Sequence, residues 1–244
     1  MIKNNITRLF INKALKLNAI IELDNSNKHY LKNVLRLTKG CYVNVFNGVD
    51  GEWQSIFDFK GDYFLKCKAL VREQKPEGGP KLYFALIKNH NVRWMIEKVT
   101  ELGVQEITPI ITERSNNKNF NEKKAWSHIK EAAEISERLT LPKLKKKNTL
   151  VNILKQTKQN SDTLFFCNES RKDDFLQNNF SNLNKCKVSF LIGPEGGFSV
   201  EEEKLIKSYS HVKSVKLFDR IVKAETAAVL ALSIFNSCII KKKI

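Results

Sequence analysis

The spacing of apolar and polar residues changes character near residue 80. Before that point, short strand-like runs alternate with turn residues: CYVNVF, EWQSIFDF and YFLKCKALV. Asn47-Gly48 and Asp50-Gly51 lie between the first two runs and are hairpin signals, because these residues tolerate the positive φ of tight turns. The pattern predicts a small antiparallel β-barrel in the first part of the chain.

After residue 80, strand-like and helical patterns alternate. In NVRWMIEKVTELG the apolar residues recur every three or four positions, which predicts a helix that stops at Gly103. Strand-like runs stand at KLYFALI, ITPII, TLFFC, VSFLIG and VKSVKLF, and further helical patterns at AWSHIKEAAEISERL and AETAAVLALSIFNSC. This alternation predicts an α/β domain with a mostly parallel sheet.

The two regions are separated by EQKPEGGP, residues 73–80. Two prolines and two glycines interrupt the pattern there, as is typical of a linker between domains. We therefore expect a first domain at 1–73, a linker at 74–80 and a second domain at 81–244.

The charge balance indicates a polyanionic partner. The chain has 42 Lys and Arg against 26 Asp and Glu, a formal net charge of +16. Nucleic acid and a membrane surface both fit this excess, and a generally lysine-rich composition is the alternative explanation. The N-terminus lacks a cleavable apolar leader and no window approaches ~18 uncharged apolar residues, so we expect a cytoplasmic protein without membrane contact.

The cysteines and histidines do not indicate a metal site. The five cysteines are widely scattered and never form C-x-x-C, and the four histidines lie far apart. Neither a zinc site nor a disulfide framework is expected from such spacing.

The glycine-rich stretch LIGPEGGFSVEEEK, residues 191–204, is the first candidate site. Ser199 and Glu202 have the spacing of a capping box, so PEGG becomes the turn between a buried strand and a helix. Open α/β sheets bind ligands at such turns, and Gly196 and Gly197 permit positive φ and close approach of a ligand. Neither a Walker loop nor G-x-G-x-x-G is present. Taken alone, a tight turn and a binding loop are equally good interpretations.

A second loop, LFDRIVKAETA at 217–227, again follows a predicted strand and precedes a helix. Together, LIGPEGGFS and LFDRIVKAETA resemble the signature segments of the bacterial ribosomal RNA uracil-N3 methyltransferases of the SPOUT class. LIKNHNVRWMIEKVTELGVQEITPIITERS and EAAEISERLTLP also fit that family, and TRLF, His29 and VLRLTKG fit it more loosely. The resemblance spans nearly the whole chain.

This resemblance implies a trefoil-knotted SPOUT domain behind a PUA-like RNA-binding β-barrel. It further implies a homodimer that uses S-adenosylmethionine to methylate N3 of a uridine in 16S ribosomal RNA or the small ribosomal subunit. Cofactor contacts are expected from FFCNES (165–170), IGPEGG (192–197) and LFDRIVKAET (217–226), at Cys167, Ile192, Gly193, Gly196, Gly197, Leu217, Phe218, Asp219, Ile221, Val222 and Thr226.

The catalytic candidates are Arg220 and Glu195. Arg220 has the charge to stabilise the developing anion or to grip a phosphate, and an interface salt bridge is its alternative role. Glu195 is a candidate to accept a proton or orient Arg220, and a helix cap is its alternative; for Glu225 we favour the structural role.

The expected RNA contacts are basic residues from both domains. Seven basic residues and no acid occur between Arg138 and Lys158, which suits phosphate contacts, although a solvated loop has the same composition. The candidates are Arg8, Lys32, Arg36, Lys88, Arg114, Arg138 and Lys223.

Two positions depart from the family pattern. Phe218 stands where glycine is usual, and Lys223 stands where arginine is usual, which keeps the charge but loses bidentate binding of phosphate. Two other functions remain open from the residues. One is a nucleotide-phosphate enzyme that uses PEGG as an anion cradle, and the other is a noncatalytic RNA-binding factor with a degenerate SPOUT domain.

Overall fold

The structure is a computed structural model and describes residues 6–115, 119–169, 172–180 and 184–240. Its internal contacts divide the chain into two compact units. The first comprises Met1–Pro76 and Ala133–Leu141, and the second comprises Glu77–Ala132 and Pro142–Ile244. The division differs from the expected domains at 133–141, which sequence alone places in the second domain. Ala133 and Leu139 share a buried apolar cluster with Phe46, which explains this grouping.

The first unit is a five-stranded sheet with the order β1-β3-β4-β5-β2. Its neighbours pair antiparallel, as predicted, except that β1 and β3 pair parallel. The first strands and a short helix were not predicted, because they offer little periodicity. The elements are β1 (Arg8–Phe10), β2 (Ile20–Glu22), α1 (Asn25–His29), the π-helix η1 (Tyr30–Val34), β3 (Tyr42–Phe46), β4 (Glu52–Lys60) and β5 (Asp62–Arg72).

A buried carboxylate lies among these strands. Glu52 is 2% exposed and accepts hydrogen bonds from Arg8 Nε at 2.8 Å and from Arg72 Nε at 2.5 Å. Burial alone raises the pKa of Glu52, but the hydrogen bonds and positive charges of Arg8 and Arg72 outweigh it, so the pKa lies below its usual value. Glu52 is therefore ionised in the folded unit at neutral pH.

The second unit is built on a sheet with the order β12-β10-β11-β6-β7-β8, and β9 also pairs with β7. Every described pair in this sheet is parallel, which confirms the predicted fold class. Its strands are β6 (Lys81–Ala85), β7 (Glu106–Ile111), β8 (Lys143–Leu144), β9 (Asn148–Thr149), β10 (Thr163–Cys167), β11 (Val188–Ile192) and β12 (Val212–Val215).

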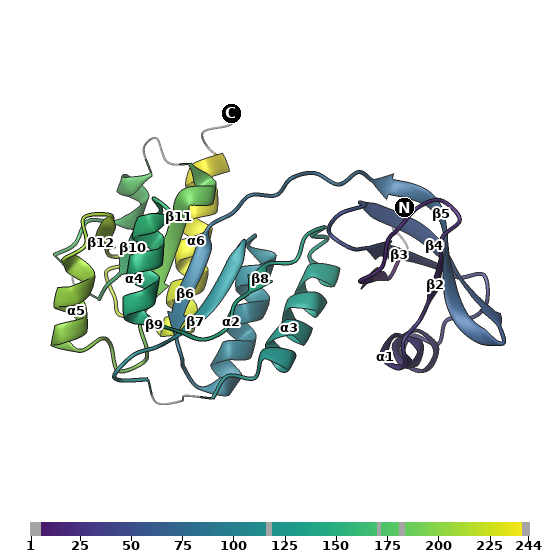
Figure 1. Ribbon diagram of the computed structural model, residues 1–244, viewed down its shortest axis with the longest axis horizontal. Coiled ribbons are helices and arrows are strands. Elements are labelled where there is room, and N and C mark those ends of the chain that lie inside the picture. The colour runs from purple at the N-terminus through teal and green to yellow at the C-terminus, as the bar shows by residue number, and fades with distance from the viewer. Residues whose placement is uncertain (1–5, 116–118, 170–171, 181–183, 241–244) are drawn as a thin grey trace. The chain divides into compact units, whose positions relative to one another are not determined.

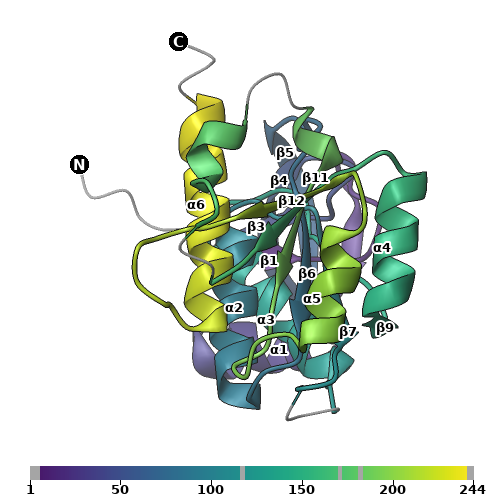
Figure 2. The same cartoon turned by 90° about the vertical axis from the view of Figure 1, so that its left-hand side faces the viewer.

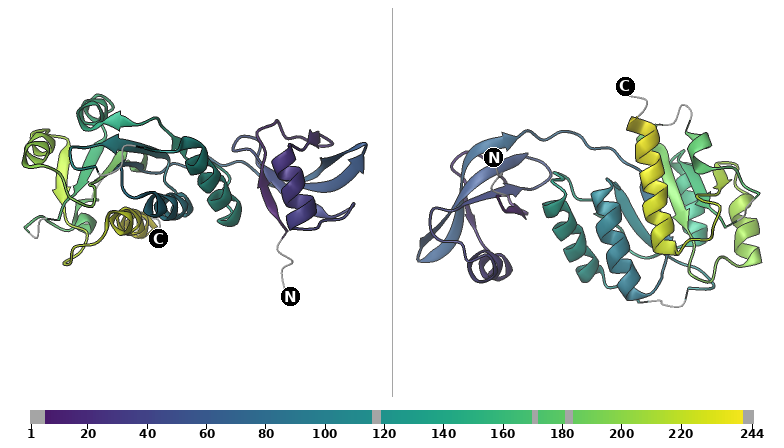
Figure 3. Two further views of the ribbon diagram at one scale, coloured as in Figure 1. Left: turned by 90° about the horizontal axis from the view of Figure 1, so that it is seen from below. Right: turned by 180° about the vertical axis from the view of Figure 1, so that it is seen from behind.

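Helices cover both faces of the parallel sheet (Figures 1 and 2). On one face, α4 and α5 pack with strand residues in a shared apolar core. On the other, α2 packs against α6, and Phe235 of α6 meets the rings of Phe180 and Phe190 edge-on. Figure 3 shows α2 and α3 side by side. The helices are α2 (Asn89–Glu101), α3 (Glu122–Ile135), α4 (Leu150–Gln159), η2 (Leu176–Asn179), η3 (Lys185–Lys187), α5 (Val200–Lys207) and α6 (Ala224–Ile240).

Helix ends follow local backbone chemistry. Gly103 has a φ of 83° just after α2, as expected for a glycine stop. The helical pattern at 125–139 predicts a helix into Leu139, but α3 ends at Ile135 because Glu137 adopts a φ of 59°. The threading of the C-terminal segment through a trefoil knot stays a prediction. In the part of the chain that the structure describes, no helix combines the length and apolarity needed to cross a membrane.

Candidate active site

Three segments meet at one edge of the parallel sheet. They follow β10, β11 and β12, which are neighbours in the sheet and parallel, so their carboxyl ends lie together. This is the edge at which open α/β sheets bind ligands. The predicted loop 165–170 belongs to this edge through residue 169, and Ser170 lies outside the described residues.

A cavity of about 310 Å³ lies between these segments. This volume falls at the lower end of the roughly 300–1,000 Å³ of small-molecule sites. Of the predicted cofactor residues, all but Gly196 and Thr226 line the cavity: Cys167, Ile192, Gly193, Gly197, Leu217, Phe218, Asp219, Ile221 and Val222. Both catalytic candidates, Glu195 and Arg220, and the predicted RNA contact Lys223 also line it.

The PEGG segment forms a tight turn. The Gly197 amide donates to the Pro194 carbonyl at 3.0 Å, and Gly197 has a φ of 68°. Gly196 does not adopt positive φ, contrary to our expectation, and a Cβ there would make only ordinary contact with Arg114. Gly193 is the constrained position, because a Cβ would come within 2.9 Å of the Phe198 ring. Gly193 thus leaves room for the Phe198 ring, which lines the cavity, and Gly197 permits the positive φ of the turn.

The turn is braced from both sides. The predicted capping box of α5 is present: Ser199 Oγ accepts from the Glu202 amide, and Glu202 Oε2 accepts from the Ser199 amide. The other oxygen, Glu202 Oε1, accepts from the Glu113 amide beyond β7 at 2.9 Å. Arg114 Nη1 donates to the Gly196 carbonyl at 3.2 Å. These bonds fix the glycine turn to the neighbouring loop.

Glu195 lies on the exposed side of this turn. Asn91 Nδ2 at the start of α2 donates to Glu195 Oε1 at 3.3 Å. The carboxylate therefore has a defined direction while it still lines the cavity. This position suits a group that accepts a proton or orients a reactant.

The segment after β12 places the positively charged Arg220 on the exposed side of the cavity. The Arg220 guanidinium lies over the Phe218 ring, 4.8 Å from its centroid. The adjacent carboxylate of Asp219 is directed to Lys216 Nζ at 3.3 Å instead. Among the described residues, no carboxylate is within ion-pair distance of Arg220, so its charge is available to a ligand.

Glu225 does not line the cavity. It lies in the first turn of α6 and is buried, and its Oε2 has no hydrogen-bond partner among the described residues. The positive end of the helix dipole stabilises a carboxylate in such a position. This placement fits the structural role that we favoured.

Sequence reasoning missed several lining residues. Phe198 follows the expected IGPEGG segment, and Glu203 and Ala227 come from the two flanking helices, whereas Asn168, Glu169 and Ala224 lie within segments that were expected to contact the cofactor. Proximity to the signature segments was the only available signal. Burial raises the pKa of the Cys167 thiol, so this side chain lines the cavity as a neutral group.

The predicted RNA contacts have different environments in the two units. Arg8 does not fit the prediction: its side chain is 9% exposed and donates to Glu52 and to the carbonyls of Ala133, Glu134 and Arg138. Arg138 belongs to the same segment, 133–141. Lys32 and Arg36 are exposed in the first unit, and Lys88, Arg114 and Lys223 are exposed in the second.

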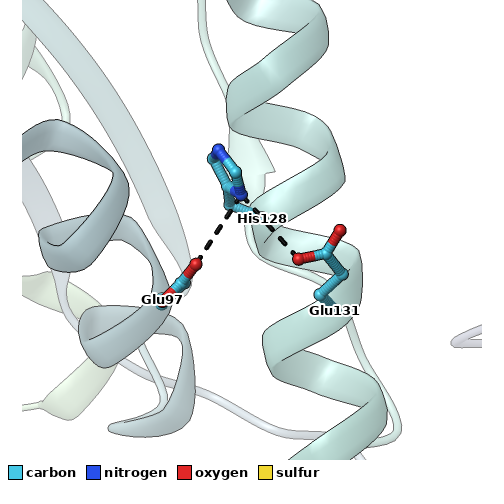
Figure 4. A group of neighbouring side chains, drawn as sticks. All are labelled: Glu97, His128 and Glu131. Atoms are coloured by element: carbon cyan, nitrogen blue, oxygen red, sulfur yellow. Dashed lines mark ion pairs between the residues drawn. The ribbon is translucent and has the colours of Figure 1, made fainter. Parts of the chain in front are cut away.

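One cluster elsewhere has the residue types of a metal site. Glu97 of α2 and His128 and Glu131 of α3 place one ligand atom each within 4.8 Å of one another (Figure 4). His128 Nδ1 lies 3.7 Å from Glu97 Oε1 and 3.9 Å from Glu131 Oε2. However, Arg93 Nε already donates to Glu97 Oε1 at 2.8 Å, and a cation would have to displace it. We interpret the cluster as an ion-pair group between two helices.

Comparison with known proteins shows the family of the chain. The family model described as RNA methyltransferase domain matches residues 76–236, and that described as RNA methyltransferase PUA domain matches 23–57. The ribosomal RNA small subunit methyltransferase E of Rickettsia conorii is 34% identical over 93% of both chains. The protein of the same name from Buchnera aphidicola subsp. Schizaphis graminum is 31% identical over 95% of this chain and 96% of its own.

Solved structures show the same fold. A putative methyltransferase from Legionella pneumophila, solved with bound S-adenosylmethionine, has a TM-score of 0.84 and 26% identity over 96% of this chain and 98% of its own. The ribosomal RNA small subunit methyltransferase E of Neisseria gonorrhoeae, also bound to S-adenosylmethionine, has a TM-score of 0.84 over the same shares, at 19% identity.

Proposed function

Because the chain belongs to the family of the ribosomal RNA small subunit methyltransferases E, we propose that it methylates N3 of a uridine in small-subunit ribosomal RNA, with S-adenosylmethionine as donor. Family membership supports S-adenosylmethionine as the methyl donor and ribosomal RNA as the substrate. The observation that carries the proposal is the cavity, in which both signature segments meet beside the Arg220 guanidinium, a group with no carboxylate partner in the part of the chain that the structure describes. The choice of uracil N3 rests on the resemblance of those two segments.

The cavity fits S-adenosylmethionine in size and surface. Buried apolar side chains, among them Ile192 and Leu217, line its interior, while Gly193 and Gly197 leave backbone groups accessible. Such a surface suits the adenosine and methionine parts of the cofactor, which polar backbone groups then orient. When bound, the cofactor supplies an activated methyl group on a sulfonium.

The protein's own task is to prepare and hold the uracil. N3 of a neutral uracil carries a proton, so methyl transfer requires that this proton leave and that the resulting anion be stabilised. Arg220 is a preorganised positive group that lines the cavity. It stabilises the anion or binds the phosphate of the target nucleotide. Glu195, held by Asn91, lines the same cavity and would accept the proton. It is not within ion-pair distance of Arg220, so its alternative role of orienting Arg220 has no support from the described contacts.

A ribosomal RNA substrate supports the predicted cytoplasmic localisation, because ribosomal subunits are assembled there. A base inside folded RNA has to leave its stack to reach the cavity, as in other enzymes that modify bases. Lys88, Arg114 and Lys223 are exposed cations of the second unit and would contact phosphates. The homodimer is a further prediction, which sedimentation tests.

The experiment combines purified protein, labelled S-adenosylmethionine and small ribosomal subunits from a deletion strain. We expect label in the ribosomal RNA, and mass spectrometry of the digested RNA should locate it on uridine N3. Label on a ribose or a cytosine would contradict the substrate assignment. Calorimetry separates the alternatives: binding of S-adenosylmethionine without ATP fits the methyltransferase, and binding of neither fits the noncatalytic factor.

A further inference from the structure

The lining of the cavity has two parts that differ in exposure. Ile192, Phe198 and Leu217 are 2%, 6% and 7% exposed and form the interior. Phe218 and Ile221, which also line the cavity, are 45% and 69% exposed. Arg220 and Lys223 are exposed beside them. We call the four residues Phe218, Arg220, Ile221 and Lys223 the rim of the cavity.

The proposed reaction needs a place for each of two reactants. The enclosed apolar interior suits the small cofactor, which a protein can surround. The rim faces solvent, from which a macromolecular substrate has to approach. An exposed aromatic ring together with exposed cations has the composition of a site for a single nucleotide, since rings bind bases and cations bind phosphates.

The Phe218 ring is held in place by its neighbours. Arg220 lies over the ring at 4.8 Å from the centroid, a cation–π contact that restricts both side chains. Asp219 does not compete for the guanidinium, because it is directed to Lys216. The pair therefore presents, at the same place, an aromatic surface and a positive charge that no described carboxylate compensates.

We propose that Phe218 is a substrate-binding residue that stacks against the unpaired target base of the RNA, while Arg220 and Lys223 contact charged groups of the RNA. This inference rests on the proposed methyltransferase function and adds the means by which the base is held. Every base has a π-face, so stacking supplies affinity and orientation and does not select uracil over other bases. Selection then belongs to groups that reach the edge of the base.

The test compares four variants of the full chain: Phe218→Ala, Phe218→Leu, Phe218→Tyr and Phe218→Trp. For the alanine and leucine variants we expect kcat/KM for deletion-strain small subunits to fall about tenfold to a hundredfold, the effect of losing one base–aromatic stack. The tyrosine and tryptophan variants should stay close to wild type, because they keep a ring. The Kd for S-adenosylmethionine should change less than about twofold, since the interior of the cavity is intact.

Trp94→Ala is the matched control. Trp94 is an aromatic of the second unit with 43% exposure, close to that of Phe218, and it does not line the cavity. Full activity of Phe218→Leu would overturn the proposal, because it would show that no ring is needed. A parallel loss of cofactor affinity would overturn it too and would make Phe218 a cover over the cofactor.

Failure of the proposed function has its own signature. In that case the wild-type protein would label no ribosomal RNA. The stacking proposal would then be decided by the RNA affinity of the same variants in filter binding, where equal affinity of wild type and Phe218→Ala would overturn it.

Discussion

Arg220 is the residue on which the proposed chemistry depends. Its guanidinium lines the cavity, rests on the Phe218 ring and has no acidic partner among the described residues. Two other cations of the same region are engaged by the protein itself: Lys216 pairs with Asp219, and Arg114 donates to the Gly196 carbonyl. The availability of its charge distinguishes Arg220 from these neighbours.

We predict that Arg220→Ala leaves the affinity for S-adenosylmethionine nearly unchanged and slows methyl transfer by roughly two orders of magnitude or more, the scale of losing one preorganised charge contact. Arg220→Lys should restore only part of the rate, because it returns the charge without the planar fork. Single-turnover rates and calorimetry on one preparation measure both quantities. If Arg220 forms an interface salt bridge instead, sedimentation will show dissociation of the dimer together with weaker cofactor binding.

At the scale of elements, the start of α5 determines the shape of the cavity wall. The capping box orders the first turn of the helix, and the same Glu202 reaches across to the Glu113 amide after β7. One side chain thus connects two loops at the carboxyl edge of the sheet. The turn at 194–197 precedes this helix, so the same contacts restrict the conformation of the turn.

We predict that Glu202→Ala weakens binding of S-adenosylmethionine several-fold and lowers the free energy of unfolding by about 1 kcal/mol, the usual effect of losing a cap. Glu201→Ala is the matched control, because it removes the same charge from the same helical turn and Glu201 is exposed. Calorimetry and urea denaturation measure the two effects. Equal behaviour of the two variants would mean that helix charge matters and the bond to Glu113 does not.

At the scale of the whole molecule, the stability of the first unit depends on one buried charge, the carboxylate of Glu52. Glu52 of β4 binds Arg8 of β1 and Arg72 of β5, and Arg8 also binds carbonyls of the segment at 133–141. Segments distant in sequence are therefore joined through a single carboxylate. Removing one member of a buried ionic group is costly because the others stay buried without compensation.

We predict that Glu52→Gln destabilises the first unit by about 3 kcal/mol, as expected for breaking a buried ion pair. Glu137→Gln is the control: Glu137 is 73% exposed and lies 3.9 Å from Arg72, so its loss should change stability by less than about 1 kcal/mol. Urea denaturation with a probe in the first unit, such as Trp53 fluorescence, measures both.

The pH dependence of the same unit provides a second measurement. The pKa of Glu52 is lower in the folded unit than in the unfolded chain, so its ionised form contributes stability above the unfolded pKa. This contribution should be lost as the pH falls below about 4.5 and through the lower folded pKa. Glu52→Gln should show a smaller loss over that range, and an unchanged pH profile would contradict the assigned role.

Local patterns in the sequence determined the α/β alternation, the glycine stop of α2 and the capping box of α5. Each of these features depends on side-chain period or turn chemistry within a few residues, which the sequence contains directly. The resemblance of the two signature segments to a known family indicated the cavity residues, and both segments lie where predicted strands end. Residues that follow neighbouring parallel strands lie close together, because the carboxyl ends of those strands share one edge of the sheet.

Only the tertiary structure decided what each long side chain contacts. Arg8 has the charge of an RNA contact in the sequence, yet it is buried against Glu52, 44 positions away. Residues 133–141 comprise the end of α3 and the segment after it, yet they belong to the first unit. The ring of Phe218 and the guanidinium of Arg220 share the rim because the segment after β12 turns them toward one cavity. Such contacts depend on how distant segments pack, and charge, period and spacing along the chain carry no record of that packing.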